Sequence, residues 1–430
     1  MYFYRVDETV CCSFQQLDLP PAAADARARV SAFLFERPLE RSRAHFAVND
    51  VLLLYQQEED AGWLSSRVLA ERATRVLAER ATRAQAQLGA VDAEVRDAIA
   101  RGRLRAVNLR HPRWRELLTV AETLAPGKKR VHLLALGDVG SHILIGLRLL
   151  GGDVISRIGI CDLNDKVAAR WEFEANQIAP AFALDALPPV EIVAQDALFD
   201  CDVFIFAASA GVPPVGENVG DVRMLQLEKN TAIISSYARQ ARNAGFRGLF
   251  CEVSDPVDPL AKAAWRASNL DDTGVFDGQG LLPEQVQGYG LGVMNARAAY
   301  YARSDARFAQ FLREGRCFGG HGKELVVADS IENYDDALSR ELTTLALEAN
   351  LRMRELGFKP FVAPAYSSGV LSILATLRGE DHYGSVFLGG SYMGVKNRTT
   401  PAGQQHEILP LADALMARIR ASEASLAAIN

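Results

Sequence analysis

The sequence predicts an α/β protein built around a doubly wound parallel sheet, followed by an α+β domain. From Val131 onward, short apolar runs alternate with amphipathic segments of helical periodicity. Such alternation produces a parallel sheet with right-handed crossover connections, and therefore helices on both faces of the sheet. After about Asn295 the segments become longer helices with a few antiparallel-looking strands. This change of pattern predicts the second domain.

Each strand of the predicted sheet corresponds to an apolar run of strand length. A helix that reaches about Leu150 follows the first run, and a helix over Lys166–Gln177 follows the second. Short apolar runs of this kind are typical of buried parallel strands, although periodicity alone does not separate them from buried helical segments. The expected strands are Val131–Leu136, Ile155–Cys161, Val203–Ala207, Thr231–Ser235 and Gly248–Val253.

Residues 1–127 differ from the rest because they contain little glycine and much Ala, Arg, Glu and Leu. From Trp63 to Ala100 the periodicity is helical, and the segment RVLAERAT at Arg67–Thr74 is repeated at once. A repeat of this length extends a helix by a little over two turns and nearly preserves its apolar face. We therefore expect a mainly helical N-terminal extension, with a helical hairpin that packs on the core or on a second subunit. A ligand-binding role for this hairpin is the alternative.

Shorter segments of the same region have a mixed character. Met1–Arg5 and Ala32–Phe35 are typical of strands, whereas Val51–Gln56 fits either a strand or the start of a helix. Pro126-Gly127, followed by basic residues, indicates a domain boundary. The expected division of the chain is 1–127, 128–294 and 295–430.

The composition excludes several classes of function. The chain has 430 residues and a formal net charge of −6, and no dense basic stretch offers a surface for nucleic acid or for a membrane. No run approaches the roughly 20 apolar residues that a membrane helix needs. Met1–Cys12 does not have the form of a signal peptide, and the six cysteines include no CxxC pair. We expect a cytoplasmic protein, with buried thiols and without a metal site.

A glycine turn after the first strand is the first candidate site. The segment Ala135–Gly140 fits GxGxxG except that Ala135 replaces the first glycine. Such a turn lets the N–H groups at a helix N-terminus approach a pyrophosphate. The next strand ends at Asp162, whose carboxylate is placed to bind an adenosine ribose and would repel a 2′-phosphate. A Rossmann-type dinucleotide site is predicted, with NAD favoured over NADP; a similar domain for another nucleotide is the alternative. The candidate contacts are Ala135, Gly137, Asp138, Val139, Gly140 and Asp162.

Three later motifs carry a resemblance to a known family. They are AGVP at Ala210–Pro213, SDPVD at Ser254–Asp258 and GGHG at Gly319–Gly322. In this order they resemble the lactate/malate dehydrogenase family, over about 300 residues that end with a helix at Leu411–Ile429. The resemblance implies hydride transfer between NAD and a small carboxylate, a homodimer or homotetramer, and a substrate domain at 295–430. It adds Ala208, Ala210 and Gly211 to the candidate cofactor contacts.

The resemblance also assigns roles to single residues. His321 matches the catalytic histidine, and imidazole is a suitable acid and base because it titrates near neutrality. Arg297 matches the arginine whose guanidinium forks onto the substrate carboxylate. Arg223, seven residues before Asn230, matches a loop arginine that closes over the substrate and polarises its carbonyl. Ser367 matches a hydroxyl residue that lines the substrate pocket.

Two residues depart from the family's pattern. The aspartate that orients the family's catalytic histidine aligns with Met294, and the asparagine of its SNPVD motif is Asp255 here. One hypothesis is that Asp255 becomes the partner of His321 or binds a cationic group of the substrate. A second is that 2-oxoacid reduction is impaired and that the enzyme does something else. A third, purely structural interpretation is that Asp255 caps the helix that begins at Pro256.

Three functions therefore remain open at this point. The leading one is an NAD-dependent oxidoreductase acting on a small carboxylate with a 2-hydroxy, 2-oxo or imino group. The second is an imine or amino-acid-derived ketone reductase, in which Asp255 meets a substrate nitrogen. The third is an NAD-binding sensor or scaffold without turnover, in which the N-terminal region supplies the partner surface.

Overall fold

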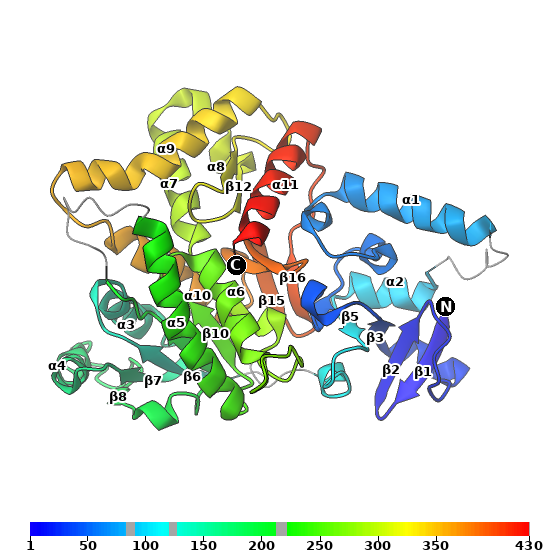
Figure 1. Ribbon diagram of the computed structural model, residues 1–430, viewed down its shortest axis with the longest axis horizontal. Coiled ribbons are helices and arrows are strands. Elements are labelled where there is room, and N and C mark those ends of the chain that lie inside the picture. Colours follow the sequence, from blue (N-terminus) through cyan, green and yellow to red (C-terminus); the bar gives the residue numbers. More distant parts are fainter. Residues whose placement is uncertain (83–90, 120–126, 212–221, 430) are drawn as a thin grey trace.

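The structure of the protein, a computed structural model, describes residues 1–82, 91–119, 127–211 and 222–429 (Figure 1). Within these ranges, the side chains of residues 79–82 and 222–226 are outside the description. The chain forms two sheets: one of five strands from the first 110 or so residues, and one of eleven strands from the rest.

The larger sheet contains the predicted doubly wound arrangement. Its six parallel strands lie in the order β8 (Val190–Ile192), β7 (Ile155–Cys161), β6 (Lys129–Leu134), β9 (Val203–Phe206), β10 (Leu249–Glu252) and β11 (Val286–Gly288). Counted along the chain from β6, this order is 3-2-1-4-5-6. The strand order reverses between β6 and β9, and ligands of doubly wound sheets bind outside the carboxyl ends of the strands at such a point.

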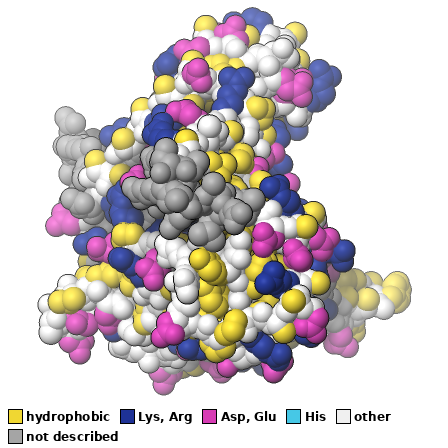
Figure 2. All heavy atoms as spheres, turned by 90° about the vertical axis from the view of Figure 1, so that its right-hand side faces the viewer, with side chains coloured by type: hydrophobic (Ala, Val, Ile, Leu, Met, Phe, Trp, Pro, Cys, Tyr) yellow, Lys and Arg dark blue, Asp and Glu magenta, His cyan; other side chains and the backbone are white. Residues whose placement is uncertain are grey.

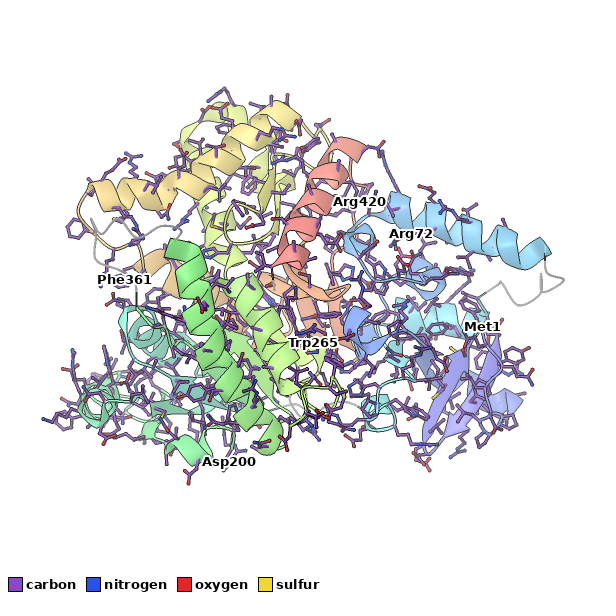
Figure 3. The ribbon with its side chains drawn as sticks, viewed as in Figure 1. Met1, Arg72, Asp200, Trp265, Phe361 and Arg420 are labelled. Carbon is purple, nitrogen blue, oxygen red and sulfur yellow. The ribbon has the colours of Figure 1, made fainter. Side chains whose placement is uncertain are left out.

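Helices cover both faces of the parallel strands. One face carries α3 (Asp138–Leu150) and α4 (Asp165–Asn176), and the other carries α5 (Val222–Asn243) and α6 (Val257–Ser268), which cross in front of the sheet in Figure 1. Trp265 of α6, labelled in Figure 3, packs edge-on against Phe276 and Phe387. The buried side chains of these helices pack on the faces of the sheet. The candidate site lies beyond the carboxyl ends of the strands.

One expected strand, Thr231–Ser235, is wrong because these residues lie in the middle of α5. The helix buries Leu227, Asn230, Ile234, Ala238 and Ala241, which follow one another at intervals of three or four residues. That spacing places them on one helical face. The short apolar run within the helix resembles a buried strand when it is considered alone.

The last part of the chain extends the same sheet with antiparallel strands. These are β12 (Arg316–Gly319), β13 (Leu325–Ala328), β14 (His382–Leu388), β15 (Ser391–Thr400) and β16 (Gly403–His406). Around them lie α7 (Leu291–Ser304), α8 (Phe311–Glu314), α9 (Asp336–Glu355), α10 (Leu371–Arg378) and α11 (Asp413–Ala428), the expected final helix. The proposed boundary at 294/295 falls inside α7, and the sheet continues from β11 into β14. The parallel and antiparallel parts therefore share one framework.

The N-terminal extension is built around a sheet, which corrects the expectation of a mainly helical region. The strands expected at Met1–Arg5 and Ala32–Phe35 are both present in this sheet. Its strands lie in the order β1 (Tyr2–Val6), β2 (Thr9–Ser13), β3 (Val30–Phe35), β5 (Arg105–Asn108) and β4 (His45–Ala47). We call residues 1–119 the N-terminal unit. Its strands are short and lie between Arg- and Ala-rich segments, which hides their alternation in the sequence.

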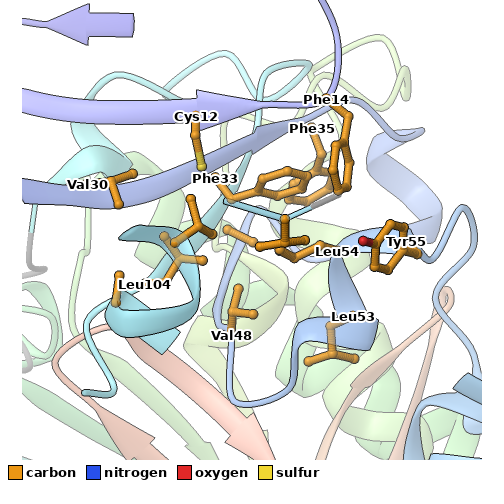
Figure 4. Packing of buried hydrophobic residues seen from close by; sticks show 14 of the residues in the cluster. Cys12, Phe14, Val30, Phe33, Phe35, Val48, Leu53, Leu54, Tyr55 and Leu104 are labelled. Carbon is orange, nitrogen blue, oxygen red and sulfur yellow. The ribbon is translucent and has the colours of Figure 1, made fainter. Parts of the chain in front are cut away.

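Two helices and a compact apolar core complete the N-terminal unit. The helix α1 (Ser66–Thr82) packs mainly on single turns at Val51–Tyr55 and Ala61–Leu64, whereas α2 (Ala93–Ala100) packs on β3. The expected hairpin is thus two helices whose main contacts are with different parts of the unit. Figure 4 shows the aromatic and aliphatic side chains that these elements enclose, with Phe14 against Phe33 and Tyr55.

Hydrogen bonds hold the N-terminal unit on the rest of the molecule. The backbone N–H groups of Ala44 and His45 donate to the two carboxyl oxygens of Glu284 over 3.1 and 2.9 Å. The Arg105 guanidinium donates to the carbonyl of Ala402 over 3.0 Å. The N–H of Ala61 donates to Glu423 of α11; Figure 3 labels Arg72 and Arg420 on the two helices at this side of the junction. These hydrogen bonds come from residues outside α1 and α2, so they do not test the expected packing of the helical hairpin on the core.

In the part of the chain that the structure describes, no helix is long and apolar enough to span a bilayer. Lys and Arg side chains are interspersed with Asp and Glu on the face that Figure 2 presents. All six cysteines are buried and free.

Candidate active site

The glycine turn connects β6 to α3 at the point where the strand order reverses. Ala135 has φ of 72°, the left-handed region in which glycine is favoured. A Cβ added at Gly140 would overlap the carbonyl oxygen of Ala135, which explains the glycine there. A Cβ added at Gly137 would meet nothing within 4 Å. Open space above a helix N-terminus fits the approach of a pyrophosphate.

Asp162 follows β7 and binds the glycine turn. Its Oδ2 accepts from the N–H of Leu136 over 2.8 Å, and its Oδ1 accepts from the N–H of Asn164 over 2.9 Å. Each carboxylate oxygen has a further lone pair that a ribose hydroxyl can use. Asp162 therefore also shapes the turn, a role that the sequence did not indicate.

The two residues that follow Gly137 differ in their surroundings. Asp138 is exposed, and its carboxylate lies 3.1 Å from the Nζ of Lys359. Its carbonyl oxygen lies 2.8 Å from the Nδ1 of His142. Val139 instead lines a small cavity of about 40 Å³ beside His321. The start of α3 thus forms one wall of the cavity that also contains the candidate acid–base residue.

Asp255 and His321, 66 residues apart in the chain, meet in the structure. Asp255 Oδ1 lies 3.1 Å from His321 Nδ1, and the Asp255 side chain is 67% exposed. The α6 helix has Pro256 as its N-cap and has no side-chain cap. The Asp255 carboxylate therefore lies against the imidazole of His321.

A second carboxyl group holds the backbone of the histidine. The N–H of His321 donates to Asp258 Oδ2 over 3.0 Å, and Ser385 Oγ donates to Asp258 Oδ1 over 2.7 Å. Burial raises the pKa of the Asp258 carboxyl, and these hydrogen bonds oppose the shift. The two carboxyl groups of the SDPVD segment therefore hold both the ring and the backbone of His321.

Arg297 and Met294 lie one turn apart on α7. Met294 is buried, and Arg297 Nη1 lies 3.5 Å from its sulfur. Burial lowers the pKa of the Arg297 guanidinium, and the carboxylate of Asp255 opposes this shift. Arg297 is therefore electrostatically coupled to the same carboxylate that contacts His321.

Ser368, the neighbour of the expected pocket residue Ser367, lines the small cavity beside His321. Ser368 Oγ donates to the carbonyl of Gly290 over 2.7 Å and accepts from the N–H of Val293 over 2.8 Å. Ser367 offers its backbone carbonyl to the hydroxyl of Ser372. Both serines lie in a π-helical segment, Pro364–Val370. A π-helix changes the helical register, so motif alignment does not decide which of two adjacent hydroxyls faces the cavity.

The turn after β9 contains the remaining cofactor candidates. Ala208 accepts from Ser254 Oγ through its carbonyl over 2.8 Å, and the N–H of Ala210 donates to Asn230 Oδ1 over 2.8 Å. Gly211 has φ of 88°. Arg223 lies in the first turn of α5, and its side chain is outside the described residues. Asn230, which sequence analysis used only as a spacing marker, is the buried residue that joins this turn to Asp255.

The site has no arrangement of metal ligands among the residues described. No group of three or more His, Cys, Asp or Glu side chains there is placed to hold an ion. The chemistry that these residues can support is proton transfer at His321, anion binding at Arg297 and nucleotide binding at the glycine turn.

Sequence comparison identifies relatives of part of the chain. Over 143 residues, the chain is 32% identical to an L-lactate dehydrogenase of Lactobacillus helveticus, covering 33% of this chain and 41% of the relative. Over 201 residues, it is 28% identical to that of Staphylococcus saprophyticus, covering 46% and 56%. The chain thus aligns with about half the length of the curated relatives it matches. No protein-family model matches it.

Comparison of folds extends over more of the chain. A minor L-lactate dehydrogenase of Enterococcus mundtii matches 70% of this chain and 97% of its own with a TM-score of 0.56 and 19% identity. Malate dehydrogenase from Archaeoglobus fulgidus, solved with NADH, matches 69% and 97% with a TM-score of 0.54 and 18% identity. At these identities the structural matches show the fold. Together with the sequence matches they confirm the predicted resemblance to the lactate/malate dehydrogenases.

Proposed function

We propose that this protein is an NAD-dependent oxidoreductase that interconverts a small 2-hydroxy carboxylate and its 2-oxo form. The observation that carries the proposal is the contact of 3.1 Å between His321 Nδ1 and Asp255 Oδ1 beside the wall formed by Val139. A histidine held by a carboxylate next to a dinucleotide turn is suited to proton transfer coupled to hydride transfer.

The cofactor would be held at the carboxyl ends of β6, β7 and β9. Gly137 leaves room for a pyrophosphate, Asp162 is placed for the adenosine ribose, and the turn Ala208–Gly211 would face the nicotinamide. When bound, NAD supplies hydride exchange at the nicotinamide ring. The named lactate and malate dehydrogenase relatives, one of them solved with NADH, support NAD as this cofactor.

His321 is proposed to move the proton. In oxidation its free imidazole nitrogen removes the hydroxyl proton of the substrate, and in reduction it returns that proton to the carbonyl oxygen. Asp255 would hold the other ring nitrogen and so fix the orientation of the imidazole toward the substrate. In this chain Asp255 thus performs the orienting role that Met294 is unable to perform.

Arg297 is proposed to bind the substrate carboxylate through its guanidinium, which makes two parallel hydrogen bonds to such a group. Arg223 is proposed to polarise the substrate carbonyl. Ser367 or its neighbour Ser368 would line the pocket. Because Asp255 is two-thirds exposed, a substrate nitrogen can reach its carboxylate; this favours imine reduction as the second candidate reaction.

The experiment is a turnover assay on a panel of 2-oxoacids and cyclic or amino-acid-derived imines, with NADH and NADPH as separate reductants. We expect turnover of a monocarboxylic 2-oxoacid with NADH, because Asp255 disfavours a second negative charge in the pocket. NADH should bind more tightly than NADPH. Binding of NADH without turnover on the whole panel would instead support a sensor or scaffold.

A further inference from the structure

We propose that Asn230 is a positioning residue for this reaction: together with Ser254 it fixes the Asp255 turn against the turn Ala208–Gly211. The inference rests on the proposed function, in which Asp255 serves the acid–base residue and Ala208–Gly211 serves the cofactor. The Asn230 side chain acts through the backbone of these two turns rather than on the acid–base residue or the cofactor itself.

Asn230 joins three segments through one buried amide. It lies on α5 and is 1% exposed. Its Oδ1 accepts from the N–H of Ala210 over 2.8 Å, and its Nδ2 donates to the carbonyl of Asp255 over 2.8 Å. The same Nδ2 lies 3.4 Å from Ser209 Oγ. Because an amide is planar and rigid, it sets the separation between the two backbone segments that it bridges.

Ser254 provides a second connection between the same two turns. Its Oγ donates to the carbonyl of Ala208 over 2.8 Å, and its N–H donates to Glu252 Oε1 over 2.6 Å. Glu252 is fully buried, and burial raises the pKa of its carboxyl well above the usual range. Glu252 therefore holds the backbone N–H of Ser254 in place, and burial disfavours its charged form beside Asp255.

These contacts lie just beyond the end of the sheet, where side chains take over from strand pairing in connecting the two turns. The strands β9 and β10 are neighbours in the sheet, and their pairing is extended by a last ladder bond from the N–H of Val253 to the carbonyl of Phe206 over 3.1 Å. Beyond this bond the two turns are connected through Asn230 and Ser254. A displacement of about 1 Å between reacting groups lowers rates by about 10²-fold, so the connection bears directly on catalysis.

The test compares Asn230→Ala with a matched control, Asn269→Ala. Asn269 is also buried, and its Nδ2 donates to the carbonyls of Trp265 and Leu281 over 2.8 Å, while its Oδ1 accepts from Gly280. Both substitutions remove a buried amide that bridges backbone segments, but Asn269 bridges segments remote from the site. Ser254→Ala is an independent variant that removes only the second connection.

Two readouts are measured on the NADH complexes of the full chain: kcat for the identified substrate, and the ¹⁵N chemical shift of His321 Nδ1, which reports its hydrogen bond to Asp255. We expect Asn230→Ala to lower kcat by about 10- to 100-fold and to move the Nδ1 shift toward that of Asp255→Ala. Ser254→Ala should do the same to a smaller extent. Asn269→Ala should lower thermal stability while leaving both readouts as in the wild type.

The outcomes separate this inference from the proposed function. If Asp255→Ala changes the Nδ1 shift but Asn230→Ala and Ser254→Ala leave shift and kcat unchanged, the positioning role is wrong while the acid–base pair stands. Equal effects of Asn269→Ala on both readouts would also overturn it. If even Asp255→Ala leaves the Nδ1 shift unchanged, the acid–base pair itself is wrong. Should Asn230→Ala fail to fold, Ser254→Ala decides.

Discussion

Two histidine–carboxyl pairs in this molecule have similar distances and different surroundings. At the junction with the N-terminal unit, His45 Nε2 lies 3.4 Å from Glu284 Oε1, and the two side chains are 6% and 4% exposed. In the candidate active site, His321 Nδ1 lies 3.1 Å from Asp255 Oδ1, and the exposed fractions of the two side chains are 18% and 67%. A short distance alone therefore does not distinguish a structural pair from one that is proposed to be catalytic.

The difference between the pairs is access to solvent and to ligands. Burial lowers the pKa of His45 well below its usual range and raises the pKa of Glu284 to about 7. The junction pair is thus not a full ion pair at neutral pH, and the Glu284 oxygens are already used by backbone N–H groups. The pair of His321 and Asp255 borders a cavity. This access is what the proposed proton transfer between imidazole and substrate requires. Burial favours cohesion in the first pair, and access favours chemistry in the second.

The comparison is tested most strongly by replacing each histidine with alanine. His321→Ala should lower kcat by about 10²–10⁴-fold, the usual contribution of general acid–base catalysis, with nearly unchanged NADH affinity and thermal stability. His45→Ala should do the opposite, because it removes a packed side chain from the junction: stability should fall by about 1–3 kcal/mol with kcat within a few-fold of the wild type. Steady-state kinetics and calorimetry on both variants measure this. Normal turnover of His321→Ala would make that residue structural.

Glu284→Gln should change how stability depends on pH. A carboxyl whose folded pKa is raised contributes stability below its unfolded value, near 4.5, and this contribution is lost as pH rises to about 7. The unfolding free energy of the wild type should therefore fall by on the order of 2–3 kcal/mol relative to the variant across this range. Denaturant titrations at several pH values measure the difference. Exposed Glu116→Gln is the control and should give a curve parallel to the wild type; a parallel curve for Glu284→Gln would contradict the buried, raised pKa.

Arg297→Lys should weaken binding of the substrate carboxylate, although the positive charge is retained. An ammonium does not reproduce the two parallel hydrogen bonds of a guanidinium to a carboxylate. We expect kcat/KM to fall by roughly 10- to 100-fold, mainly through KM. Arg303→Lys, an exposed change on the same helix, is the matched control and should have no effect. Unchanged kinetics for Arg297→Lys would mean that the substrate carboxylate binds elsewhere.

Asp255→Asn removes the charge of the cleft pair and keeps the size of the side chain. Turnover of the natural substrate should fall by about tenfold or more, because a neutral amide stabilises imidazolium less than a carboxylate does. The substrate profile should shift, with simple 2-oxoacids gaining turnover relative to the natural substrate in steady-state assays. Because asparagine keeps the size of the side chain and one acceptor oxygen, thermal stability should change little. An unchanged profile would separate Asp255 from the chemistry.

Ala135→Gly should have the smallest effect, on stability alone. Alanine at φ of 72° costs roughly 1–2 kcal/mol relative to glycine, offset in part by the greater flexibility of glycine in the unfolded chain. We expect a gain of about 1 kcal/mol in unfolding free energy, with NADH affinity kept. A loss of stability would indicate that the Ala135 methyl group contributes packing that outweighs the backbone strain.

Much of the catalytic part could be predicted because its signals are local. The glycine turn, Asp162 at the end of the next strand and the glycines around His321 each lie within a few residues of one another or of a strand end. Two strands of the N-terminal sheet were expected, but the sheet itself was not, because some of its strands pair with distant partners: β3 joins β5, more than 70 residues later in the chain. The strand expected at 231–235 is wrong because a run of five residues is too short to show the helical periodicity of α5.

The sequence by itself determined which chemical groups are present and which local turns they occupy: an imidazole between glycines, a carboxylate after β10 and a helix N-terminus after β6. Only the tertiary structure decided which groups meet. Asp255 reaches His321 because β10 and β12 belong to one sheet, and Asn230 reaches the Asp255 carbonyl because α5 packs beside α6. Ser368 lines the cavity because a π-helical turn alters the register there. Such pairings depend on how distant segments close on one another, and they are set by packing over the whole chain rather than by the spacing of neighbours.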